Sequence, residues 1–242
     1  MRFVLPLVFL AAVGGGCGAV EPAGLGGSSS AESGLVLKVE HVQGGELAEL
    51  SAAVYADGRV FRPDPRILVY PGPVLTTFSV ARMSGDRVAQ VVDAVRELEP
   101  EPGEPGAGVT VVTLATEGRP RTVRLPGGSG AAARLGAAVS DLPIMGEERY
   151  RPFAVAVLAR PAKHVEPGAD GLAVTPQPAL LEWPLELLRP GCSVVSGPDA
   201  QRVLAAARRA NELSRWRGGG SLYTVAFRPL LPGESSFDDI AS

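Results

Sequence analysis

Residues 50–62, LSAAVYADGRVFR, carry a strong local signal for β-structure. Two runs rich in β-forming residues, Leu50 to Tyr55 and Arg59 to Arg62, bracket Ala56-Asp57-Gly58. Asp-Gly between such runs predicts a β-hairpin, because both turn residues tolerate positive φ. We therefore expect an antiparallel sheet built outward from this hairpin.

Other segments also have the composition of β-strands. A second hairpin is predicted where Val109 to Ala115 and Arg119 to Leu125 flank Glu117-Gly118. Phe153 to Arg160 is apolar at nearly every position, which is typical of a strand buried on both faces. The remaining predicted strands are residues 36–42, 67–70, 76–81, 192–196 and 222–227, with a short edge piece at 183–185.

Three helices are predicted among these strands. The first begins after Ser84 as N-cap and has valines on one face at helical spacing. The second is an Ala-rich run over residues 131–142. The third begins at Pro198 and is expected to continue to about Trp216, where three glycines would end it.

These elements predict an α+β fold, with mostly antiparallel sheet or sheets and about three helices packed on one face. A strand, helix and strand follow one another at residues 76–115 and again at residues 192–227. This repetition leaves a second interpretation open, namely two related αβ sandwich blocks. We assign residues 35–147 to a first αβ block and residues 148–242 to a second.

Residues 1–17 have the pattern of an export signal. Arg2 precedes an apolar run from Phe3 to Val13, which is too short to cross a bilayer but suits the centre of a cleaved leader. The Gly-Gly-Gly-Cys sequence ending at Cys17 resembles a bacterial lipobox, in which the cysteine receives diacylglycerol on its sulfur. Lipidation of Cys17 is therefore expected, with a plain secretory leader as the alternative.

The segment after the leader has the composition of a spacer. Residues 18–34 are rich in Gly and Ser and lack apolar periodicity, as expected of a flexible tether. Two acyl chains on Cys17 would give durable membrane anchoring. The expected location is thus the cell envelope, with the protein either lipid-anchored on the outer face of the cytoplasmic membrane or secreted.

The charge of the chain argues against nucleic acid as a partner. The 242 residues include 23 Lys and Arg and 26 Asp and Glu, which gives a formal net charge of −3 at pH 7. A mildly acidic chain without a basic block is a poor candidate for binding a phosphate backbone. The predicted last helix is crowded with arginines, and a solvated face explains them without an anionic ligand; they are Arg208, Arg209, Arg215 and Arg217.

Few residues qualify for catalysis or metal binding. The sequence has only two histidines, His41 and His164, so a three-histidine metal site is excluded, and we predict no metal, cofactor or catalytic residue. It has two cysteines, so lipidation of Cys17 would leave Cys192 as a lone thiol. Cys192 lies in a β run and is expected to be an inert hydrophobe. Ser129 lies in a Gly-rich turn that does not fit a nucleophile elbow.

Several stretches together resemble an uncharacterised group of actinobacterial lipoproteins and secreted proteins of unknown function. They are residues 36–42, the hairpin around residues 55–60, residues 67–73, and residues 210–234 with their Phe-Arg-Pro-Leu-Leu-Pro-Gly-Glu ending. The group has no assigned activity, so the resemblance implies export and fold and supplies no catalytic residue. Its members tend to carry a cysteine just after the Leu-Leu-Pro-x-Glu piece, able to pair with the counterpart of Cys192. This chain has Ser235-Ser236-Phe237 there.

The sequence thus predicts an exported, lipid-anchored envelope protein that acts as a non-enzymatic binding module. Its expected partners are the membrane, through the lipid on Cys17, and an envelope protein, peptide or wall component. Two alternatives stay open. One is a structural envelope protein without a ligand, and the other is an enzyme that uses Cys192.

Overall fold

The computed structural model describes residues 34–240, apart from residues 45, 66–68, 100, 105–107, 117–118, 141, 143–144 and 163–177. Within this part of the chain, the predicted α+β class is confirmed. Antiparallel strands dominate, and they are accompanied by the helices α2 (Gly85–Arg96), α3 (Gly130–Ser140) and α4 (Gly197–Ala207).

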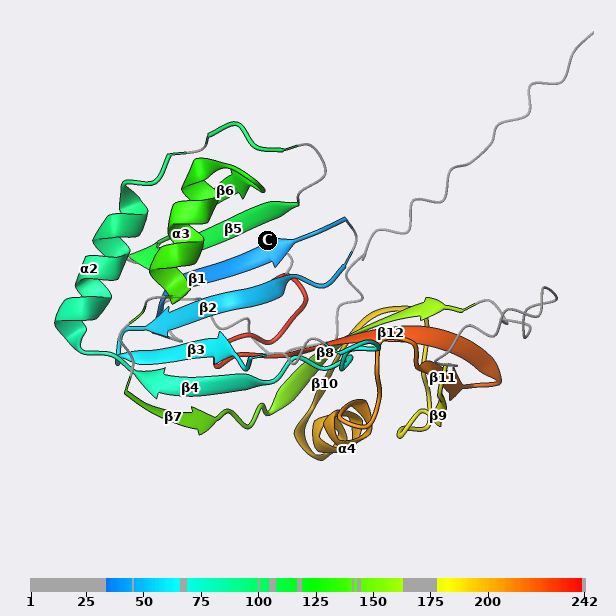
Figure 1. Cartoon of the computed structure of the whole chain (residues 1–242). Coiled ribbons are helices and arrows are strands. Elements are labelled where there is room, and N and C mark those ends of the chain that lie inside the picture. The colour runs from blue at the N-terminus through cyan, green and yellow to red at the C-terminus, as the bar shows by residue number, and fades with distance from the viewer. Residues whose placement is uncertain are drawn as a thin grey trace, which may run out of the picture.

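The first sheet is seven-stranded and antiparallel, in the order β6-β5-β1-β2-β3-β4-β7 (Figure 1). Both predicted hairpins lie in it. In the hairpin of β2 and β3, Gly58 adopts φ +83° and donates its N–H to Tyr55 O. The strands are β1 (Leu35–Val42), β2 (Glu49–Tyr55), β3 (Arg59–Pro63), β4 (Phe78–Arg82), β5 (Val109–Thr116), β6 (Arg119–Pro126) and β7 (Met145–Arg149).

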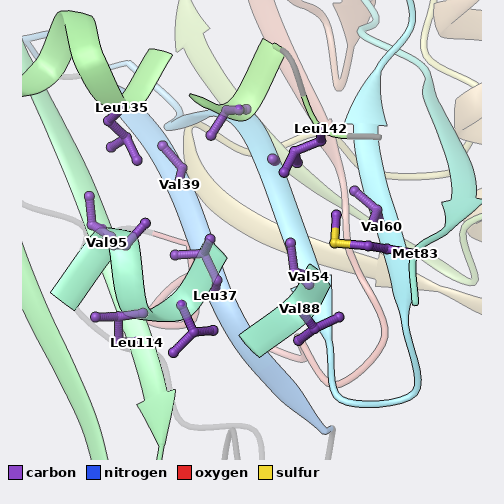
Figure 2. Close-up of a cluster of buried hydrophobic side chains, with 14 of the residues drawn as sticks. Leu37, Val39, Val54, Val60, Met83, Val88, Val95, Leu114, Leu135 and Leu142 are labelled. Atoms are coloured by element: carbon purple, nitrogen blue, oxygen red, sulfur yellow. The ribbon is translucent and has the colours of Figure 1, made fainter. Parts of the chain in front are cut away.

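Helices α2 and α3 cover one face of this sheet, and the main core lies beneath them (Figures 1 and 2). Ser84 precedes α2 in an extended conformation, as expected of an N-cap residue. The buried stripe of α2 consists of Val88, Val92 and Val95, which matches the predicted helical spacing. Figure 2 shows Val88 and Val95 packed among Leu37, Val54 and Leu114 of the sheet. Each fully buried aliphatic side chain of this kind contributes about 1.5–3 kcal/mol.

The second sheet is five-stranded, in the order β10-β8-β12-β11-β9, with α4 on one face (Figure 1). β8 lies inside this sheet and is buried over most of its length, as its apolar sequence predicts. Trp183, just after β9, packs with Trp216 and Phe227 at centroid distances of 6.3 Å or less. The strands are β8 (Ala154–Pro161), β9 (Leu180–Glu182), β10 (Gly191–Ser196), β11 (Arg215–Gly218) and β12 (Ser221–Pro229).

Residues 229–240, which we call the C-terminal segment, return from β12 to the first sheet, on the face opposite α2 and α3 (Figure 1). Leu231 is buried in a cluster with Tyr55 and Phe61. Two tyrosines at the first sheet bind the backbone of this segment. Tyr55 of β2 donates to Pro232 O at 2.8 Å, and Tyr150, which directly follows β7, donates to Leu230 O at 3.0 Å. The C-terminal segment therefore joins the two sheets.

The prediction that the third helix continues to Trp216 is wrong. α4 ends at Ala207, and Arg215–Gly218 forms β11, which pairs with β12 and β9. A turn replaces the rest of the predicted helix, because Asn211 Oδ1 accepts the N–H of Leu213 at 3.0 Å. Gly219 and Gly220 have φ of +56° and +79° and turn the chain into β12. The four arginines expected on one helix face are thus distributed over a turn and a strand.

Two smaller predictions also differ from the structure. Residues 67 and 68 lie outside the described residues, and Val69 and Tyr70 are exposed and not in a strand, so the predicted strand at 67–70 is not seen. The two segments with the order strand, helix, strand, residues 76–115 and 192–227, also differ in how their strands are placed in the sheets. Between β4 and β5 the first sheet places three strands, whereas a single strand separates β10 from β12.

Candidate functional site

A cleft of about 510 Å³ lies between the two sheets. This volume is within the range of about 300–1,000 Å³ that is usual for ligand sites. Its lining consists of Glu46, Leu47, Ala48, Glu49, Leu50, Pro63, Asp64, Pro65, Val74, Thr76, Phe78, Leu158, Arg160, Ala226, Phe227 and Arg228. Both αβ blocks therefore contribute to it.

The second sheet provides the floor of the cleft. Leu158 of β8 and Ala226 of β12 are paired in register, so their side chains point to the same face of the sheet. This is the face opposite α4, because α4 packs with the neighbouring residues Val157 and Val225. The C-terminal segment covers part of this face through Ile240, and the rest stays open toward the cleft.

One wall of the cleft comes from residues 63–65 and 74–78. The chain crosses between the sheets here, because Leu75 forms a parallel bridge with Phe227 of β12. Asp64 follows β3 and accepts hydrogen bonds from the hydroxyls of Thr77, at 2.5 Å, and Ser79. These two donors fix the carboxylate of Asp64 at the edge of the cleft.

The opposite wall comes from residues 46–50, where β2 separates from β3. In the described residues, the pairing between β2 and β3 consists of Ala53 with Phe61 and Val54 with Val60, next to the turn. Leu50 pairs with Glu40 of β1 on its other side. The two strands therefore diverge from the turn toward the cleft, like the sides of a wedge.

Four buried charges lie between the cleft and the first core. Lys38 Nζ is 2.9 Å from Glu40 and 3.2 Å from Glu234. Arg228 lies 2.5 Å from Glu40 and 2.7 Å from Glu234. All four side chains are at most 7% exposed. Two positive and two negative groups thus form a neutral cluster, which we call the buried charge cluster.

The cluster fastens the C-terminal segment to β1. Lys38 and Glu40 lie on β1, Arg228 lies near the end of β12, and Glu234 belongs to the C-terminal segment. Lys38 also donates to Asp239 O, and the N–H of Leu231 donates to Glu234 at 2.8 Å. In the described residues, one buried polar atom of the cluster, Arg228 Nε, has no hydrogen-bond partner.

Burial and charge act in opposite directions on the acids of the cluster. Burial is the largest influence on Glu234 and by itself raises the pKa, but Arg228, Lys38 and the N–H of Leu231 together hold this pKa below its ordinary value. For Glu40, burial outweighs the two cations and raises the pKa. Burial, followed by the charge of Glu234, raises the pKa of Tyr150 to about 12. Glu234 is therefore held as the ionised partner of Arg228.

Sequence analysis did not identify this cluster. The alternation in residues 36–42 predicts a strand, but it does not indicate which part of the chain covers the strand face that carries Lys38 and Glu40. The available signal was the resemblance itself. Tyr55, Arg228 and Glu234 belong to separate stretches that carry it, and these stretches meet in the structure.

The single residues considered for chemistry have other surroundings. Ser129 is buried and its hydroxyl accepts the N–H of Ala132 at 3.2 Å, so it caps α3. His41 lies on β1 opposite Thr110 of β5. Cys17 and His164 lie outside the described residues. Neither Ser129 nor His41 adds a nucleophile to the cleft.

Cys192 is not a lone thiol in this structure, because its sulfur is disulfide-bonded. The residue lies on β10 in register with Leu158, which lines the cleft. A lone thiol at Cys192 was predicted only for a chain with a lipid on Cys17, and the structure has the sulfur of Cys192 in a disulfide instead. The sulfur of a disulfide has no proton to lose and does not act as a thiolate nucleophile.

The described residues contain no group of three or more His, Cys, Asp or Glu side chains arranged to hold a metal ion. None of the helices in the described ranges combines the length and apolar character that a membrane span requires. Comparisons of the chain with protein families, with curated proteins and with solved structures found no match.

Proposed function

We propose that the chain is an exported cell-envelope protein that works as a non-enzymatic binding module, with its ligand in the cleft between the two sheets. The cleft is the observation that carries this proposal. It is large enough for a ligand, has an apolar floor, and has charged side chains at its edges. The disulfide at Cys192 also favours binding over thiol catalysis.

The proposal includes export and anchoring to the membrane. The leader pattern of residues 1–17 and the spacer of residues 18–34 support export, and the lipobox-like ending supports a lipid on Cys17. A plain secretory leader, which would give a secreted form, stays the alternative to the lipid anchor.

The test compares the open cleft with a filled one. Ala226 lines the cleft floor and is partly exposed, so the variant Ala226→Trp is expected to fill the cleft. The control variant Ser221→Trp adds the same side chain at an exposed hairpin end. Each mature protein is incubated with detergent-released envelope extract and examined by native mass spectrometry. We expect a bound species with the wild type and Ser221→Trp that disappears with Ala226→Trp.

The alternative is a structural envelope protein without a ligand, which the buried charge cluster and the joined sheets favour. In that case, all three proteins carry the same species or none, while far-UV circular dichroism shows the same fold. That outcome would contradict the proposal of a binding module.

A further inference from the structure

We propose that the loop between β3 and β4 and the turn after α4 form a surface that docks on an anionic lipid bilayer. We call it the turn surface, and it consists of Val69, Tyr70, Leu180, Arg208 and Arg209. This inference rests on the export and anchoring part of the proposed function and adds a second contact with the membrane. Its support comes from exposed apolar side chains, from the bonds that hold them, and from charge.

Exposed apolar side chains gather around the turn after α4. Six large apolar side chains of the described residues are exposed. Two of them are adjacent in the loop, Val69 at 57% and Tyr70 at 71%, and neither belongs to a core cluster. A third, Leu180, is 49% exposed and pairs with Arg215, directly after the turn. Exposed apolar groups that lie together rather than singly mark interaction surfaces.

Backbone contacts hold the exposed loop against the turn. Near the tip of the loop, Gly72 O accepts the N–H of Glu212 at 2.9 Å. The next residue, Pro73, forms an antiparallel bridge with Asn211. At the base of the loop, two hydroxyl donors fix the carboxylate of Asp64. The two apolar side chains are therefore presented by a loop that is fastened at its base and near its tip.

The turn carries an excess of positive charge. Residues 208–215 include three arginines, Arg208, Arg209 and Arg215, and one acid, Glu212, so cations exceed anions by two. The side chains of Arg208 and Arg209 are exposed, and neither forms an ion pair within the described residues. Cations beside exposed apolar groups are the composition of a surface that binds anionic lipid.

The proposed anchor places a bilayer within reach of this surface. Residues 18–34 have the composition of a flexible spacer between Cys17 and the first strand, and a spacer of this length spans about 20 Å. A lipid on Cys17 would hold the folded chain near the membrane at a high effective concentration, so that weak contacts suffice. The ring of Tyr70 is amphipathic, as is typical of side chains at a membrane–water interface. A bilayer is therefore favoured as the partner of the turn surface.

The test uses the mature chain from Cys17, produced without lipid, which contains all of the described residues. Flotation with vesicles of phosphatidylcholine and phosphatidylglycerol in equal parts is compared with flotation with phosphatidylcholine alone. We expect binding to the anionic vesicles to be about fivefold tighter or more, and to weaken as salt is added. Absence of binding, or equal binding to both kinds of vesicle, would overturn the proposal.

One pair of variants tests the apolar side chains. The double substitution Val69→Ser and Tyr70→Ser should weaken binding to the anionic vesicles about tenfold, because less apolar surface enters the interface. The matched control is Met145→Ser, which removes an apolar side chain that is 74% exposed on β7, and it should leave binding unchanged. Equal effects of the two changes would overturn the assignment to the turn surface.

A second set of variants tests the cations. Arg208→Gln and Arg209→Gln should each weaken binding to the anionic vesicles about fivefold. Arg124→Gln removes the same charge from an exposed position on the edge strand β6 and should change binding much less. If Arg124→Gln weakens binding as much as the other two variants, the attraction depends on net charge alone and the proposal is overturned.

Insertion of the loop can be measured directly. Both tryptophans of the chain, Trp183 and Trp216, are buried, so brominated lipids should quench their fluorescence little. Tyr70→Trp should add a component that brominated anionic vesicles quench, whereas Met145→Trp should add one that they do not quench. A component at position 70 that these vesicles leave unquenched would overturn insertion of the loop.

Two comparisons separate this inference from the proposed function. Ala226→Trp fills the cleft, which is distinct from the turn surface, so this variant should float with vesicles as the wild type does. Loss of vesicle binding alone, with Cys17→Ala still releasing the protein from the membrane fraction, would overturn the turn surface and keep the anchor. Vesicle binding that persists while Cys17→Ala leaves fractionation and processing unchanged would overturn the anchor and keep the turn surface.

Discussion

At the scale of single residues, the buried charge cluster shows how charged side chains are tolerated in an interior. Lys38, Glu40, Arg228 and Glu234 balance one another, so no net charge is buried. Removal of one member leaves its partners unpaired in a medium of low dielectric constant, which costs far more than the pair itself contributes. Each member is therefore sensitive to substitution.

Glu234→Gln is expected to lower the free energy of unfolding by about 3–5 kcal/mol at pH 7, because it leaves Arg228 without one of its two anions. Urea denaturation followed by circular dichroism measures this change. The surface control is Asp199→Asn, whose ion pair with Arg202 is exposed, and it should change the free energy by less than about 1 kcal/mol.

The same variant should change the dependence of stability on pH. The pKa of Glu234 in the folded protein lies below its ordinary value of 4.5, so its contribution is complete above that value and is lost as the pH falls through the folded pKa. The raised pKa of Glu40 opposes this loss, because the folded protein binds that proton first. The acid loss of stability should therefore be shallower in Glu234→Gln than in the wild type, and equal slopes would contradict this assignment.

The sulfur of Cys17 is open to a direct test. If it is lipidated, Cys17→Ala is expected to move the protein from the membrane fraction to the medium or to leave it unprocessed, as shown by fractionation and immunoblotting. The intact mass of the wild type, measured without reducing agent, should include the diacylglycerol. A mass lower by two hydrogens than that of the reduced chain would instead identify an internal disulfide and the secreted form.

At the scale of elements, local patterns predicted the hairpins and the core stripe of α2 but failed beyond Ala207. Asp57-Gly58 and the valines of α2 depend on backbone conformation and helical spacing, which are properties of neighbouring residues. Residues 215–218 take their conformation from β12 and β9, which lie on either side of β11. Such pairing is a tertiary effect and overrides a helical pattern in the local sequence.

The turn at Gly58 should be intolerant of a side chain. Gly58 has φ +83°, and an added Cβ would collide with the carbonyl oxygen of Met83. Gly58→Ala is therefore expected to lower the free energy of unfolding by about 1–3 kcal/mol or more. Gly44→Ala is the matched control, because no heavy atom lies within 4 Å of its added Cβ. Urea denaturation of both variants compares them, and similar midpoints would contradict the collision.

At the scale of the whole molecule, the cleft and the buried charge cluster both depend on the arrangement of the two sheets. Residues 46–50 and Ala226 are far apart in the chain and become neighbours only after both sheets have formed. Most elements of the described residues could be predicted from local sequence. The cleft could not be predicted, because the strand order and the bridge between Leu75 and Phe227 of β12 are long-range properties.

The joined sheets should unfold together. Both tryptophans of the chain, Trp183 and Trp216, are in the second block, so their fluorescence reports the second sheet while far-UV circular dichroism reports the whole chain. We expect the two urea transitions to coincide in the wild type. Arg228→Met removes the shared cation of the cluster and should separate the transitions. Separate transitions already in the wild type would contradict the joining role of the C-terminal segment.

The bond between Lys38 and Asp239 joins residues 201 positions apart. The charged side of β1 is therefore covered only after residues that are synthesised much later have been made. A chain that is truncated before Glu234 keeps Lys38 and Glu40 without this cover. Completion of the native state is therefore a late event in the life of each newly made molecule.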